Sequence, residues 1–250
     1  MFRPLFWTTI VSIAAFVVLV GLGTWQLQRM AWKDDLTARV AARIVAPATP
    51  LPGVAAWPGM DLAANEYRPF TVRGTFDHGA EFHAFTAIST PKGTYGGPGY
   101  WVLTPLSLQG GGTVLVNRGF VPAARKDRQT RPDGLIEGPV DITGLLRLSV
   151  SRAPFVPEPE ISKNVWFARD VGAMAAAANI ADMAPFFLDA SQSAPGGLPQ
   201  GGETRLKFRN AHLGYALTWY GLALVLIAFY IAFHYATGRL GRQKVARPSS

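Results

Sequence analysis

The sequence predicts an α+β membrane protein in which two transmembrane helices flank a small antiparallel β-rich domain on the extracytoplasmic side. Three observations lead to this fold class: long apolar segments near both ends, short runs rich in Val, Thr and aromatic residues between them, and basic residues beside the apolar segments. Hydrophobic residues make up 49% of the 250-residue chain, a share more typical of a mixed membrane and aqueous protein than of a soluble one.

The first apolar segment covers residues 5–23 and lies between Arg3 and Arg29, with no charged residue between these two. As a helix, at about 1.5 Å per residue, it is about 28 Å long, close to the thickness of a hydrocarbon core. A cleaved signal peptide is the alternative, because the glycines near the end of the segment resemble a cleavage site. Since the apolar region is longer than that of a signal peptide, we expect an uncleaved transmembrane helix that follows a cytoplasmic N-terminus, residues 1–4.

The second apolar segment, residues 210–236, has aromatic side chains at both ends, as interfacial rings do. The tail that follows, residues 237–250, carries four basic residues and no acidic one, which favours a cytoplasmic C-terminus. Three basic residues also precede the span, but long domains are translocated largely regardless of charge. Two spans therefore place both termini in the cytoplasm and residues 24–209 outside.

The formal net charge of +8 does not indicate a nucleic-acid-binding surface, because the excess lies at the ends of the chain. Residues 34–203 contain 14 Lys and Arg against 16 Asp and Glu, whereas ten basic residues flank the apolar segments. This distribution is typical of membrane flanks and argues against nucleic acid as a partner. The lack of cysteine excludes disulfides, iron–sulfur ligation and thiolate copper sites.

The segment between the spans is predicted to fold as one domain. Residues 24–44 lack Pro and Gly and favour a helical extension of the first span, and the Ala-rich residues 170–181 predict a second helix. The Gly- and Pro-rich residues 193–203 are typical of a linker into the second span. Runs rich in Val, Thr, Phe and Tyr, separated by turn residues, predict five strands: 66–76, 81–88, 100–108, 113–121 and 139–148.

Residue chemistry gives little support for an enzyme. The sequence contains no Gly-rich phosphate loop before a helix, no Gly-x-Ser-x-Gly elbow and no His-x-x-x-His pair. His78 and His83 flank a predicted hairpin turn, but no third metal ligand is evident, so we expect ordinary surface or strand histidines. The basic cluster 124–131 is expected to be a solvated loop. A membrane-tethered envelope enzyme is kept only as an alternative.

The outer ends of the two spans carry the candidate binding residues. Each predicted helix presents a stripe of side chains three or four residues apart: Trp25, Gln28, Arg29 and Trp32 on the first, and His212, Tyr215, Ala216, Trp219 and Ala223 on the second. If the stripes face each other, a flat aromatic ligand can bind, with imidazole ligating haem iron and arginine pairing with a propionate. Interfacial anchoring by the same side chains needs no ligand and is the alternative.

Five segments, in order, carry a family resemblance: LGTWQLQRMAWK (22–33), GGPGYWVLTPLSL (96–108), VLVNRGFVP (114–122), NVWFARD (164–170) and RNAHLGYALTWYGLA (209–223). Together they resemble the Surfeit locus protein 1 family of cytochrome c oxidase assembly factors, over most of the chain and both spans. The resemblance implies a two-span layout with the main domain on the outer side of the bacterial or mitochondrial inner membrane. Because no Arg- and Ser-rich transit region precedes the first span, we expect a bacterial member with its domain in the periplasm.

The resemblance also implies a non-catalytic assembly factor that transiently binds haem a and assists its insertion into oxidase subunit I. Haem a synthase is a further candidate partner, besides membrane lipids. By its motif, His212 is the candidate axial ligand of the haem iron, and no other metal is expected. Two further groups match family signatures: Trp25, Gln26 and Arg29, and Asn117, Arg118 and Gly119. For Asn117 and Arg118, a turn-fixing role suits the motif at least as well as ligand contact. The alternative function is a protein-only scaffold that stabilises an assembly intermediate without haem.

Overall fold

The computed structural model describes residues 5–204 and 211–239. It divides the chain into two compact units, one comprising Val40–Leu206 and the other Met1–Arg39 with Lys207–Ser250. The predicted cytoplasmic N-terminus, residues 1–4, and the basic tail beyond residue 239 lie outside the described residues.

Helix α1 runs without a break over Phe6–Ile44, so the first predicted span and its expected extension, 24–44, form a single helix. Helix α4 spans His212–Ala236, within the second predicted span. Both helices are long and apolar enough to cross a membrane, by length and composition. Their sequences contain no proline, which would remove a helical hydrogen bond and kink the helix.

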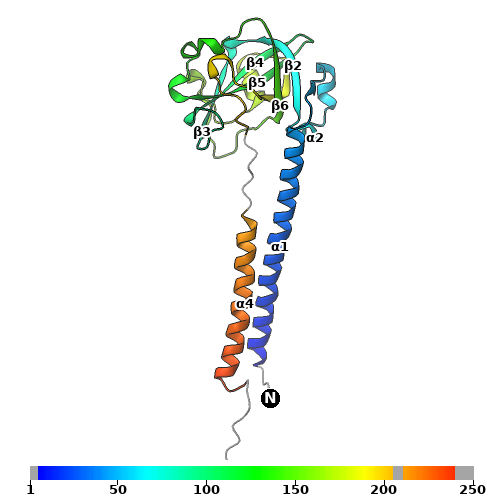
Figure 1. The fold of residues 1–250 in the computed structure, drawn as a ribbon, viewed down its shortest axis with the longest axis vertical. Helices are drawn as coiled ribbons and strands as arrows, with labels where there is room; N and C mark the ends of the chain where they lie inside the picture. Colours follow the sequence, from blue (N-terminus) through cyan, green and yellow to red (C-terminus); the bar gives the residue numbers. More distant parts are fainter. Residues whose placement is uncertain (1–4, 205–210, 240–250) are drawn as a thin grey trace, which may run out of the picture. The chain divides into compact units, whose positions relative to one another are not determined.

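The two helices lie side by side and antiparallel (Figure 1). Thr9 and Tyr230 share a hydrogen bond of 2.7 Å between their hydroxyl oxygens, and Thr24 and Tyr220 share one of 3.0 Å. Gly23 allows this approach, because a Cβ there would lie 2.9 Å from atoms of the Tyr220 ring. Small residues at such contacts let two helices pack closely where the surrounding medium offers no hydrophobic driving force.

The second unit is built on one seven-stranded sheet, in the order β1-β2-β6-β7-β5-β4-β3. A further pairing between β2 and β4 closes five of these strands into a barrel. The strands are β1 (Thr49–Pro50), β2 (Pro69–Phe76), β3 (Phe82–Ile88), β4 (Gly97–Leu108), β5 (Thr113–Pro122), β6 (Pro139–Leu148) and β7 (Met183–Ala190). The five predicted strands match β2 to β6 closely, and the expected β-rich domain between two apolar helices is confirmed.

The sequence patterns indicated neither the two-residue β1, which pairs parallel with β2, nor β7. β7 pairs antiparallel with β6 but parallel with β5, so the sheet is not purely antiparallel. The helix α3 spans Val171–Ala177 and so ends four residues sooner than the predicted helix, 170–181. The remaining helical segments are short: α2 (Leu62–Asn65) and the 3-10 turns at Val54–Gly59, His78–Ala80, Ala123–Arg125, Arg128–Thr130, Pro132–Gly134, Ile161–Lys163 and Pro195–Gly197.

Apolar side chains fill both faces of the sheet, because side chains along a strand point alternately to opposite sides. Inside the barrel, Phe76, Leu106, Val116 and Leu188 are among the buried residues of one cluster. On the outer face a second cluster packs under α3 and the segment before it: Phe82, Ala84, Leu103, Leu115, Trp166, Val171, Met174 and Phe187. Strand β5 contributes to both clusters, and all its residues except the two at its ends are buried.

Residues 193–203 pack against the domain, where their composition predicted a linker. Leu198, Gln200 and Glu203 are all buried. Gln200 forms a backbone bridge to Phe120 of β5, in which each amide donates to the other residue's carbonyl. Glycine and proline here shape a tight path over the sheet, so composition alone was a poor guide to mobility.

Candidate functional site

The candidate haem ligand, His212, is the first residue of α4 and lies against Gln26 of α1. The imidazole Nδ1 is 2.7 Å from the Gln26 side-chain oxygen Oε1. Because Oε1 can only accept a hydrogen bond, Nδ1 carries the proton and donates it. In a neutral imidazole this places the lone pair on Nε2, the nitrogen that can ligate a metal. Gln26 thus fixes both the orientation and the tautomer of His212.

Of the other residues predicted at this level, Ala216 and Ala223 of α4 are buried, whereas the aromatic side chains are more exposed. Trp25 is 51% exposed and Tyr215 58% exposed, while Trp219 is half-buried. Arg29 stacks on Trp32, with its guanidinium carbon 4.8 Å from the ring centroid. On α1 the residue that meets His212 is therefore Gln26, which lies about 100° around the helix from Trp25. The structure brings Gln26 to His212 and leaves the aromatic stripe on neighbouring faces.

In the β domain, the Asn117-Arg118-Gly119 motif lies in β5, and alternation sends Arg118 to the opposite side from Asn117. The buried Arg118 guanidinium lies 4.7 Å from the centre of the Phe76 ring, donates to the carbonyl of Gly134 and contacts Nδ1 of His78 at 3.3 Å. Burial lowers the pKa of Arg118 to about 10. Its contacts tie β5 to the loop that contains Gly134.

The Asn117 side chain both donates and accepts a hydrogen bond. Its Nδ2 donates to Oδ1 of Asp189 at 2.7 Å, and its Oδ1 accepts from the amide of Gly119 at 3.2 Å. Gly119 has a φ of 128°, and an added Cβ would collide with the backbone of Gln200 and Gly201. This motif therefore shapes a bulge in β5 and allows the close approach of the 200–204 segment.

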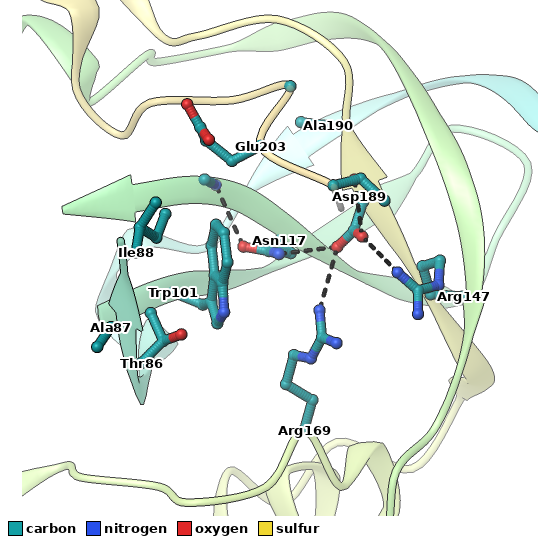
Figure 2. Close-up of a pocket in the computed structure, with 13 residues that line it drawn as sticks. Thr86, Ala87, Ile88, Trp101, Asn117, Arg147, Arg169, Asp189, Ala190 and Glu203 are labelled. Atoms are coloured by element: carbon teal, nitrogen blue, oxygen red, sulfur yellow. Dashed lines mark hydrogen bonds and ion pairs between the residues drawn. The ribbon is translucent and has the colours of Figure 1, made fainter. Parts of the chain in front are cut away.

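Asp189 is the centre of a buried polar network (Figure 2). Besides Asn117, its carboxylate accepts from Arg147 Nη1 at 3.1 Å and from the Thr204 hydroxyl at 3.0 Å. Arg169 approaches its Oδ1 at 3.6 Å. A buried carboxylate needs such partners, because desolvation without compensation is very costly.

This network forms one side of a cavity of about 260 Å³ on the outer face of the sheet (Figure 2). Trp101 of β4 and Ile88 of β3 form another part of its wall, and Glu203 lies at its edge. Sequence analysis did not single out Asp189, Arg147 or Trp101. The signal available for Asp189 was an acidic residue directly after the apolar run Phe186–Leu188, which is unusual inside a strand.

A second buried polar cluster lies around His83. Its Nε2 is 2.8 Å from Glu81 Oε1, and the same oxygen accepts from Arg131. Burial by itself raises the pKa of Glu81, but hydrogen bonds from His83 and Arg131, together with their charges, hold that pKa below its ordinary value of 4.5. His78 instead contacts the carbonyl of Ile136 at 2.9 Å. Among the residues that the structure describes, no three His, Cys, Asp or Glu side chains gather to hold a metal ion.

Comparison with known proteins assigns the family. A family model described as the SURF1 family matches residues 13–224. Surfeit locus protein 1 of Homo sapiens is 42% identical over 226 residues, which cover 83% of this chain and 71% of the human protein. The SURF1-like protein of Drosophila melanogaster is 32% identical over 251 residues, covering 88% of this chain and 81% of the fly protein. The chain belongs to the SURF1 family.

Proposed function

We propose that this protein is a membrane-anchored assembly factor for haem–copper cytochrome c oxidase, which binds haem a and assists its insertion into subunit I. Membership of the SURF1 family supports the assembly role. The single observation that supports haem binding in this chain is the hydrogen bond from His212 to Gln26.

The residues present suit a haem. Haem iron binds imidazole nitrogen. Bound haem a would supply the iron here, and a histidine of the protein would supply the nitrogen. His212 offers Nε2 as that ligand, with the ring held through Nδ1 by Gln26. Ligating histidines commonly donate their second ring N–H to an oxygen acceptor, which orients the ring and raises its basicity. His212 would therefore hold the cofactor, and Gln26 would position His212.

Ligation by a single imidazole also suits the transfer of haem to another protein. A single neutral ligand can be displaced by the histidines of a recipient protein. Subunit I would be that recipient, and haem a synthase is a candidate donor. The bilayer would accommodate a cofactor with an apolar tail while it passes between proteins, so membrane lipids are part of the proposed surroundings.

For the location we propose the bacterial inner membrane, crossed by α1 and α4, with the β domain in the periplasm and both termini in the cytoplasm. The support is the length and apolarity of the two helices and the basic residues that flank them. We propose a non-catalytic role, which the family membership supports.

The test is spectroscopic. The full chain is purified in detergent from cells that make haem a, and its visible spectrum is compared with those of His212→Ala and His234→Gln. His234 is the matched control, because it lies in the same helix and contacts the backbone carbonyl of Tyr230 at 2.9 Å. We expect His212→Ala to lose the bound haem spectrum and His234→Gln to keep it. Full occupancy in His212→Ala would rule out the ligand assignment.

A second measurement separates haem delivery from a protein-only scaffold. Each variant is tested for co-purification with subunit I and for restoring haem a content in the oxidase. Under the proposal, His212→Ala still associates with subunit I but leaves its haem a content low. Normal haem a content in the oxidase with a haem-free assembly factor would instead favour the scaffold.

A further inference from the structure

Arg169 stands out in the domain because its guanidinium is largely enclosed yet poorly satisfied. Its side chain is 23% exposed, and it contacts Asp189 Oδ1 at 3.6 Å and the face of the Phe187 ring at 4.9 Å. Neither is a hydrogen bond, and no other described residue within 5–204 and 211–239 accepts one from it. A guanidinium has five N–H donors, so most of those on Arg169 are left for water or for a bound ligand.

The nearby carboxylates are already occupied by other donors. Asp189 already accepts from Asn117 at 2.7 Å, Arg147 at 3.1 Å and Thr204 at 3.0 Å. Glu203 is occupied as well, because its oxygens accept from the backbone amides of residues 92 and 93 and from the Gln200 side chain at 2.7–3.0 Å. Arg169 lines the cavity, so its remaining donors are open to a ligand bound there.

The cavity combines this donor group with an apolar wall. Its volume is about 260 Å³, and Trp101, Ile88 and Ala190 contribute apolar surface around the polar floor of Asn117 and Asp189 (Figure 2). A pocket of this size is smaller than the 300–1,000 Å³, roughly, of sites for drug-sized ligands, so a small molecule or one end of a larger molecule fits it.

We propose that this cavity is a binding site for a small monocarboxylate with a flat apolar body, held by Arg169 through its carboxylate and by Trp101 through its body. The planar fork of arginine matches a carboxylate with two parallel hydrogen bonds. The site lies wholly in the β domain and goes beyond the proposed function, since it uses neither His212 nor the haem.

Electrostatics favour a monoanion over phosphate. Burial lowers the pKa of Arg169, Asp189 opposes this, and the neighbouring charge of Arg147 lowers the pKa further. One added negative charge beside Arg169 would offset both effects that disfavour its charged form, namely burial and the repulsion from Arg147. A dianion would also meet Asp189 and Glu203 in the same wall, at a like-charge cost. The family-resembling segments 96–108, 114–122 and 164–170 supply Trp101, Asn117 and Arg169 to this one site, a convergence that the haem proposal does not use.

Binding is measured with benzoate on the full chain in detergent, by saturation-transfer NMR titration. Benzamide, its neutral isostere, and inorganic phosphate are the comparison probes. The variants are Arg169→Gln, which removes the charge, and Arg169→Lys, which keeps the charge but loses the fork. Arg73→Gln is the matched control, because Arg73 is a 56% exposed arginine of the same domain paired with Asp141. Thermal unfolding of each variant checks that it folds.

We expect benzoate to bind the wild type and Arg73→Gln alike, and at least about 10-fold more weakly to both Arg169 variants. We expect benzamide and phosphate to bind more weakly than benzoate. If the Arg169 variants unfold, phenylglyoxal labelling of wild-type Arg169, followed by mass spectrometry, replaces them, and benzoate should slow it. Undiminished benzoate binding in Arg169→Gln, tighter phosphate binding, or no benzoate binding and no protection would each overturn the proposal. Benzoate binding by His212→Ala should be unchanged, which separates this site from the haem proposal.

Discussion

Asn117 and Asp189 occupy matched positions on the parallel strands β5 and β7, and their side chains meet at 2.7 Å between Nδ2 and Oδ1. Both residues are 4% exposed. The ladder between two parallel strands consists of backbone hydrogen bonds, so this side-chain contact adds a further, specific link between β5 and β7. The same carboxylate also holds Arg147 of β6, so one residue joins three strands.

Replacement of Asp189 by alanine should strongly destabilise the domain. The change removes the carboxylate that Asn117, Arg147 and Thr204 share and leaves Arg147 with Glu66, at 3.4 Å, as its carboxylate partner. Loss of one partner from a buried pair costs up to about 3–5 kcal/mol. Chemical denaturation of the full chain in detergent measures the free energy of unfolding. Asp141→Ala is the control, because that exposed acid pairs with exposed Arg73 and should cost about 0–1 kcal/mol. Equal losses in the two variants would contradict a special role for Asp189.

Replacement of Gly119 by alanine should also destabilise the domain, by about 2–5 kcal/mol. At a φ of 128° an L side chain is strained, and its Cβ would collide with the backbone of Gln200. Gly110→Ala is the matched control, since a Cβ there meets nothing within 4 Å. Thermal unfolding of the two variants separates a backbone requirement from a general effect of adding a methyl group. Similar melting temperatures would show that the 200–204 segment can move away at little cost.

Strands β2 to β6 could be predicted because each is a run of β-favouring residues between turn residues. The run that forms β7, MAPFFLDA, follows an Ala-rich helical segment directly, and a short apolar run is ambiguous between helix and strand. Its parallel pairing with β5 depends on contacts between residues far apart in sequence. Propensity alone contains no information on that pairing.

The sequence grouped residues on each span but could not determine which faces of the two helices meet. Helical spacing grouped His212 with Tyr215 and Trp219, yet it did not determine which face of α1 they would meet. The approach at Gly23 sets that face, and it brings Gln26 to His212. The Asp189 network could not be predicted from the sequence for a different reason. Its members come from strands and loops that only the folded sheet brings together.

The Glu81 cluster should make stability depend on acid pH. The folded-state pKa of Glu81 lies below the ordinary 4.5, so its stabilising contribution is present above pH 4.5 and is lost as pH falls through the folded-state value. Glu81→Gln should therefore be less stable than the wild type at pH 7, and the difference should shrink below pH 4.5. Thermal unfolding over pH 7 to about 3 tests this. Exposed Glu137, changed to Gln, is the control and should show no such convergence.

Gln26 should tune haem affinity without being a ligand, if the proposed function is right. Gln26→Leu removes the oxygen that accepts from His212 Nδ1 at 2.7 Å, so the ring loses its fixed orientation and some basicity. Loss of such a partner typically weakens a metal site about 10- to 100-fold, whereas His212→Ala removes the ligand itself.

Titration of the haem-free full chain with haem a, followed by its visible spectrum, measures the change in affinity. Gln28→Leu is a closely matched control: it makes the same substitution two residues further along α1, at an exposed position. We expect Gln28→Leu to bind like the wild type, and Gln26→Leu to keep the same spectral type at lower affinity, because the iron would still be ligated by His212. Equal affinities in the two variants would mean that the hydrogen bond does not support a ligand, and that Gln26 only packs the two helices together.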